Sequence, residues 1–166
     1  MTHAGHLVRR FLGSLRPGGP PPADEAWARD ALLAGERVLW DRMSGPDRRH
    51  AVGVARRTEA ALGHRATRPV VAAALLHDVG KVESGFGTFA RVGVTLAAGV
   101  VGHDRLSRRP GRVGQYVRHD RVGADLLAAA GSDPLTTAWT REHHTPEDRW
   151  TVDPVVGAAL KAADDD

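Results

Sequence analysis

The chain has 166 residues, 42% of them hydrophobic and 26% charged, and this composition is typical of one soluble domain with a sizeable core. The absence of cysteine excludes disulfides, thiolate catalysis and cysteine-based zinc sites, so any metal site must consist of histidines and carboxylates. The net charge is only +3, and the arginines are scattered with few aromatic residues among them, which argues against a dedicated nucleic-acid-binding surface.

The periodic apolar segments all predict helices, and no segment alternates like a strand. A short helix over about 3–14 is expected to end at the proline-rich linker 16–22, because consecutive prolines cannot continue a helix. Two amphipathic helices follow and are expected to be separated at Gly35. They carry two tryptophans, which would pack on the core or, alternatively, on a partner.

Residues at the ends of the next helices mark their boundaries. Ser44 is a candidate N-cap for a helix that has Pro46 in its first turn and closes at Gly63. The segment "RPVVAAALLHDVG" is expected to be a helix that ends at Gly80. After a glycine-rich loop, a further helix is expected over roughly 88–101.

Three helices are expected in the last third of the chain. The first runs from 119 to 131, and the other two begin at the pairs Asp133-Pro134 and Asp153-Pro154, with aspartate as N-cap and proline in the first helical position. We therefore predict an all-α domain of about seven to nine helices.

The sequence gives no sign of a membrane segment. No apolar run approaches the roughly 20 residues that a membrane helix needs. The N-terminal residues also lack the apolar block of a signal peptide, so we expect a cytoplasmic protein.

One apolar helix carries polar residues that burial alone does not require. In "VVAAALLHDVGKV", residues 70–82, an unbroken apolar run precedes His77 and Asp78, and Lys81 lies one turn later. Burying an ionised carboxylate costs on the order of several kcal/mol unless it is paired or bound to a metal. The alternative is an ordinary polar helix end, with Gly80 as cap and Lys81 as the terminal charge.

Further histidines lie near the ends of other predicted helices, namely His50, His119 and the pair His143 and His144. A single histidine of this kind is more often a hydrogen-bonded core residue or a surface residue. Several helices that each deliver one or two histidines, with a carboxylate available to bridge, suit a dinuclear metal centre inside a helical bundle.

The combined pattern "H…HDVGK…HDRVGADLL…HH…D" resembles the HD-domain superfamily of metal-dependent phosphohydrolases over roughly residues 44–166. The resemblance implies an HD-domain helical bundle. Residues 1–43 lie outside the resemblance, and we expect them to form N-terminal helices that pack on the bundle. The resemblance also implies close helix packing at Gly123 and Ala124. The first metal would take His50, His77, Asp78 and Asp164, and the second Asp78, His119 and one or both of His143 and His144.

Asp165 is the alternative to Asp164, because the final acidic run also resembles a solvated tail. His3, His6, His64 and His103 fall outside the pattern and are expected to be solvated.

The resemblance implies two divalent transition metal ions, either Mn, Fe, Co, Ni or Zn. Asp78 would join them, a hydroxide would lie between them, and Lys81 would contact a phosphate. The implied activity is hydrolysis of a small anionic phosphomonoester or phosphodiester, nucleotide-like in character. The alternatives are a catalytically silent HD protein that binds metal or a partner, and a di-iron oxygenase.

Overall fold

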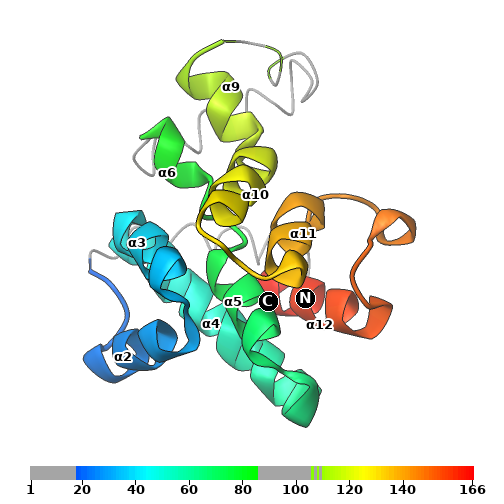
Figure 1. Cartoon of the computed structure of the whole chain (residues 1–166). Helices are drawn as coiled ribbons and strands as arrows, with labels where there is room; N and C mark the ends of the chain where they lie inside the picture. Colours follow the sequence, from blue (N-terminus) through cyan, green and yellow to red (C-terminus); the bar gives the residue numbers. More distant parts are fainter. Residues whose placement is uncertain (1–17, 86–105, 107, 109) are drawn as a thin grey trace.

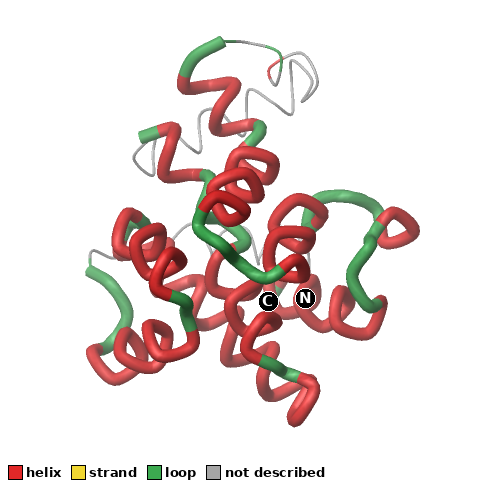
Figure 2. The backbone as a smooth tube through the Cα atoms, in the orientation of Figure 1, coloured by secondary structure: helices red, strands yellow, loops and turns green. Residues whose placement is uncertain are grey.

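The computed structural model describes residues 18–85, 106, 108 and 110–166. In this part of the chain every regular element is helical and no strand occurs, which confirms the predicted all-α fold (Figure 2). None of the described helices is long and apolar enough to cross a membrane. The helices expected over 3–14 and 88–101 lie outside the described residues, as do His3, His6 and His103.

The helices follow one another in the order shown in Figure 1: α2 Pro22–Ala31, α3 Ala34–Arg42, α4 Gly45–Leu62, α5 Arg68–Leu76, α6 Lys81–Ser84, α9 Arg112–Val117, α10 His119–Ala129, α11 Pro134–Glu142 and α12 Pro154–Asp165, with short 3₁₀ helices Gly63–Arg65 and Glu147–Arg149.

Helix α5 lies at the centre of the bundle. It contacts α4 on one side and α11 on another, while α12 packs on α4 and α10 packs on α11 (Figure 1). Every residue from Val70 to Leu76 is buried. The uninterrupted apolar sequence of α5 follows from this position, because a helix enclosed on all sides has no face for polar residues.

The predicted N-caps are present in the structure. The Ser44 hydroxyl accepts a hydrogen bond from the Asp47 amide, and Gly63 closes α4 with a φ of 55°. The carboxylate of Asp133 accepts from the Leu135 amide at the start of α11, and that of Asp153 accepts from the Val155 amide at the start of α12. These local hydrogen bonds satisfy amides that have no partner inside the helix.

The separation between α2 and α3 differs from the prediction. The helices part at Leu32 and Leu33, and Gly35 lies inside α3. The Glu36 carboxylate accepts a hydrogen bond from the Leu33 amide at 2.8 Å and so defines the start of α3. Gly35 serves packing instead, because a Cβ atom there would lie 2.2 Å from the carbonyl oxygen of Ala130.

The two described N-terminal helices both pack on the bundle: α2 contacts α4 and α5, and α3 contacts α10. Trp40 of α3 is fully buried, and its indole nitrogen donates to the Glu25 carboxylate at 2.7 Å. Arg48 of α4 donates to the same carboxylate at 3.1 Å. Glu25 therefore joins α2, α3 and α4, and one of the two tryptophans expected to pack on the core does so completely.

Candidate metal centre

The HD dipeptide lies in a tight turn that follows α5. The helix ends at Leu76, so the expectation that it continues to Gly80 was wrong. Between Leu76 and Lys81 the backbone hydrogen bonds join residues three apart, with the Val79 amide donating to Leu76 and the Lys81 amide to Asp78, each at 3.0 Å. The same spacing continues through the Val82 and Glu83 amides, and within this segment the backbone of Gly80 packs directly against α10.

Several helices direct polar side chains to one place beside this turn. His50 comes from α4, His119 is the first residue of α10, and His143 caps the end of α11. Asp164 lies in the last turn of α12. The structure thus brings together the whole set that the resemblance implied: His50, His77, Asp78, His119, His143, His144 and Asp164.

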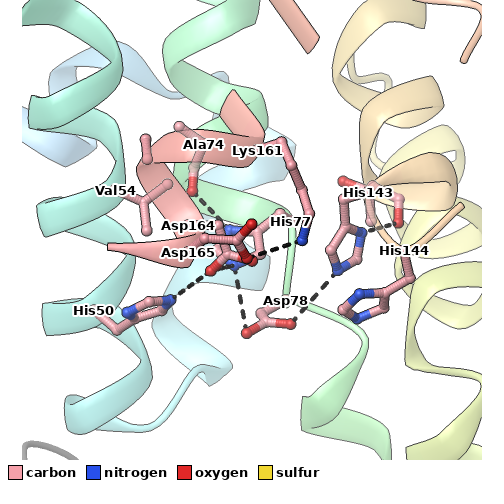
Figure 3. Close-up of polar contacts among 12 residues, drawn as sticks. His50, Val54, Ala74, His77, Asp78, His143, His144, Lys161, Asp164 and Asp165 are labelled. Carbon is pink, nitrogen blue, oxygen red and sulfur yellow. Dashed lines mark hydrogen bonds and ion pairs between the residues drawn. The ribbon is translucent and has the colours of Figure 1, made fainter. Parts of the chain in front are cut away.

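Asp78 lies between two groups of histidines (Figure 3). Its Oδ2 is 3.4 Å from Nε2 of His77, and the same oxygen accepts a hydrogen bond from the Lys81 ammonium. Its Oδ1 is 3.3 Å from Nε2 of His119 and 3.9 Å from Nε2 of His143. Each oxygen of this carboxylate therefore faces a different group of nitrogens, as a bridging ligand requires.

Asp164 provides the second buried carboxylate of the cluster. Its Oδ1 lies 3.0 Å from Nε2 of His50 and 3.5 Å from Nε2 of His77. The neighbouring Asp165 is exposed and pairs with Lys161 at 2.9 Å, as Figure 3 shows. Of the two aspartates that the sequence left open, Asp164 is the one that lies in the cluster.

Backbone carbonyls fix the orientation of three of the rings. Nδ1 of His77 lies 2.9 Å from the Ala74 carbonyl oxygen, Nδ1 of His119 lies 2.8 Å from that of Tyr116, and Nδ1 of His143 lies 2.9 Å from that of Thr140. A carbonyl oxygen can only accept, so each Nδ1 must carry the hydrogen. In the neutral ring, Nε2 then keeps its lone pair and points it into the cluster. These anchors were not predicted from the sequence, although each carbonyl lies three residues before its histidine.

The donor atoms suit a pair of metal ions. His50, His77 and Asp78 form one group of converging ligand atoms, and Asp78, His119, His143 and His144 form another, with the atoms of each group within 4.8 Å of one another. Nε2 of His77 and Nε2 of His143 are buried and have no hydrogen-bond partner among the described residues. A buried ring nitrogen without a hydrogen-bond partner is costly, and in the neutral ring each of these nitrogens could bind a cation instead.

Two histidines of the second group, His143 and His144, favour the neutral ring at physiological pH. Burial holds the pKa of His143 well below its usual range, and repulsion from His144 adds to the effect. His144 is exposed as a residue, yet neighbouring side chains displace water from its ring, and this loss, together with repulsion from His119, lowers the pKa of His144 to about 4. Metal ligation needs the neutral ring, so both residues are in the required state at pH 7.

The carboxylates control the charge of the first group. Burial disfavours the charged ring of His77, but the attraction of Asp78 and then of Asp164 outweighs it and raises the pKa of His77 to about 10. Burial also opposes ionisation of Asp78, yet Lys81 and His77 hold the pKa of that carboxyl well below its usual range. His50 has its pKa lowered by burial, which its hydrogen bond to Asp164 only partly offsets.

The cluster is open to solvent on one side. The side chains of His77 and Asp78 are 2% and 8% exposed, whereas those of His50 and Lys81 are 28% and 19% exposed. His144 is exposed as well, so a ligand would reach the carboxylates past His50, Lys81 and His144. His64 is exposed, as predicted, and lies on the 3₁₀ helix after α4, outside both groups of ligand atoms.

Comparison with known families gives one match, to the family described as "Cas3, HD domain", over residues 32–158. The match covers more than half of the chain and includes every residue of the cluster except Asp164, which lies beyond its end. No curated protein and no solved structure is significantly similar to the chain.

Proposed function

The chain belongs to the family of Cas3 HD domains, and from this premise we propose that it is a metal-dependent phosphohydrolase that cleaves a phosphodiester bond. HD domains form a superfamily of metal-dependent phosphohydrolases. The observation that carries the proposal is the position of Asp78, whose two oxygens face two separate groups of histidines.

Two divalent cations fit the ligand atoms present. His50, His77, Asp78 and Asp164 would hold the first, and Asp78, His119, His143 and His144 the second. Such a pair of cations, when bound, supplies an activated water and neutralises the charge of a phosphoryl group. Imidazole and carboxylate ligands accept Mn, Fe, Co, Ni or Zn, and the proposal extends to each of these metals.

The side chains around the pair have separate roles in this proposal. Asp78 joins the two halves of the site, and the neutral imidazoles of His143 and His144 set the geometry of the second half. Lys81 keeps its positive charge, because the attraction of Asp78 outweighs burial and raises the pKa of its ammonium. Since Lys81 lies on the open side, its ammonium can bind an oxygen of an incoming phosphate as a point charge.

Two classes of substrate contain a phosphodiester bond: small nucleotide-like molecules and nucleic acids. The scattered arginines and the net charge of +3 favour a small nucleotide-like molecule. The family match favours nucleic acid, because Cas3 HD domains act on it. The expectation that dedicated nucleic-acid binding is unlikely is therefore not confirmed, and nucleic acid is the second candidate substrate.

Hydrolysis assays test the proposal. Metal-free protein is loaded with each metal in turn and incubated with bis(p-nitrophenyl) phosphate, a cyclic nucleotide and end-labelled DNA and RNA oligonucleotides. We expect hydrolysis of at least one of them, a loss of about 100-fold or more in His77→Ala because its ligand group is incomplete, and no loss in the control His64→Ala, which alters an exposed histidine outside the cluster.

Cleavage of the oligonucleotides alone would identify nucleic acid as the substrate, and cleavage of the cyclic nucleotide alone would identify a small molecule. The proposal is wrong if His77→Ala hydrolyses as fast as the unaltered protein. Metal uptake without turnover of any of these phosphodiesters would instead support a silent metal-binding protein.

A further inference from the structure

Arg57 connects α4 to the last turn of α12. Its Nε and Nη2 donate hydrogen bonds of 2.9 Å and 2.7 Å to the carbonyl oxygen of Ala163, and the two residues are 106 positions apart in the sequence. Arg57 lies two turns after His50 on the same helix, so both side chains point from one face of α4 towards α12.

The carbonyl that Arg57 binds belongs to the residue before Asp164. Carbonyls in the last turn of a helix have no partner inside the helix, and helix ends fray unless something satisfies these groups. Basic side chains near a helix end can do so. Arg57 has this role for α12, in the turn that carries the buried carboxylate.

Asp164 is thus held from α4 at two points. His50 contacts its carboxylate, and Arg57 fixes the backbone immediately before it. A guanidinium that gives two hydrogen bonds to one oxygen restrains both the position and the direction of that carbonyl. The carboxylate of Asp164 can then stay 3.5 Å from Nε2 of His77, rather than turning to solvent as Asp165 does.

A glycine leaves room for the guanidinium. Gly53 lies between His50 and Arg57 on α4, and a Cβ atom there would be 3.3 Å from Nη1 of Arg57. Glycine inside a helix is destabilising relative to alanine. Its presence at this position is explained by the path that the Arg57 side chain takes along the helix.

We infer that Arg57 is a positioning residue for the first half of the metal site: it fixes the last turn of α12 so that Asp164 can act as a ligand beside His50 and His77. The inference rests on the proposed function. Arg57 acts through Ala163 and Asp164, whereas the histidines of the second half come from α10 and α11. The role of Arg57 is therefore specific to one of the two metals.

Calorimetric titration of the metal-free protein with Mn²⁺ tests the inference. The unaltered chain is expected to bind two ions. Arg57→Ala should lower the affinity for one of them about 10–100-fold, the usual effect of removing a residue that orients a metal ligand. The other ion should keep its affinity within about twofold. Arg57→Lys retains one donor and should restore part of the loss.

Arg56→Ala is the matched control, because it removes a neighbouring arginine that lies over the Trp27 ring and makes exposed ion pairs with Asp24 and Glu59, none of them on α12. Such pairs contribute little to stability, and both affinities should remain unchanged. A double variant that combines Arg57→Ala with Asp164→Asn identifies which half of the metal site Arg57 supports. If Arg57 acts through Asp164, then Arg57→Ala causes no further loss in the Asp164→Asn background.

The inference would be overturned if Arg57→Ala lowered the affinity for both ions equally, or for neither. Additive losses of affinity in the double variant would also overturn it. If the unaltered protein binds no metal, the proposed function fails, and amide hydrogen exchange of the metal-free protein decides about Arg57. The rate of amide hydrogen exchange depends on local opening of the helix. In the last turn of α12 this rate should therefore rise about tenfold or more in Arg57→Ala and stay unchanged in Arg56→Ala. Unchanged exchange would show that Arg57 does not fix this turn.

Discussion

Gly80 and Gly123 lie backbone to backbone. A Cβ atom at Gly80 would be 2.6 Å from the amide nitrogen of Gly123, and one at Gly123 would be 3.0 Å from the amide nitrogen of Gly80. No side chain fits between the two, so the turn that carries Asp78 packs directly on the first turns of α10. This contact brings the carboxylate of Asp78 to 3.3 Å from His119.

Alanine at Gly80 should therefore damage both stability and the second half of the site. The φ and ψ of Gly80 are −63° and −17°, which alanine adopts readily, so any loss comes from space alone. The added methyl would lie 1.9 Å from the carbonyl oxygen of His119, and the overpacking should cost about 1–3 kcal/mol in chemical unfolding.

The control for this change is Gly19→Ala. Its methyl would meet its nearest neighbour, the end of the Arg48 side chain, at 3.7 Å, an ordinary contact. We expect a change of less than about 0.5 kcal/mol for this variant. Equal stability of Gly80→Ala and Gly19→Ala would show that the close backbone contact is not required.

Asp164 and Asp165 provide a matched pair of adjacent carboxylates. Asp164→Asn should lose one of two bound metals, because its carboxylate faces His50 and His77. Asp165→Asn should keep both, because that side chain is 55% exposed and contacts Lys161. Elemental analysis of the two purified variants is the measurement, and a metal lost from Asp165→Asn alone would reverse the assignment.

The metal-free protein should be most stable near pH 6.5. His77 has its pKa raised to about 10 from an ordinary value of 6.5, so between these values the folded state binds more protons than the unfolded state. Stability then falls as the pH rises through this window. His144 has its pKa lowered to about 4, so between pH 6.5 and 4 the unfolded state binds more protons and stability falls as the pH decreases.

Thermal unfolding in the presence of a chelator, from about pH 4.5 to 9.5, measures this profile. His77→Gln should flatten only the alkaline side of the curve of unfolding temperature against pH. His144→Gln should flatten only its acidic side. His50 and His143, with pKa values also lowered, add to the acidic slope. A profile that rises or falls steadily across the whole range would contradict these pKa shifts.

Helix boundaries were predictable where one side chain determines them. Ser44, Asp133 and Asp153 cap helices through hydrogen bonds that span two or three residues, and these appear directly in the sequence. Helix α9 was not predicted, since it has six residues and follows a glycine without a side-chain cap. The separation at Gly35 was misplaced, because that glycine reflects contact with the distant Ala130.

The candidate site was predictable in its residues and not in its geometry. His50 and Asp164 are 114 positions apart, and only the resemblance to HD domains, not periodicity or spacing, implied that they meet. Asp165 remained as the alternative to Asp164 in the sequence, and the burial of Asp164 in the structure distinguishes the two. Arg57 gave no signal at all, because a carbonyl 106 residues away is its partner and any of the scattered arginines could have had this role.

The central claim is that Asp78 joins two metal ions, and the most direct measurement is the metal content of the purified protein beside Asp78→Ala. We predict close to two divalent transition metal ions per chain in the unaltered protein and less than one in the variant, because both groups of ligands share this carboxylate. A single ion in the unaltered protein, or two retained after loss of Asp78, would contradict the account.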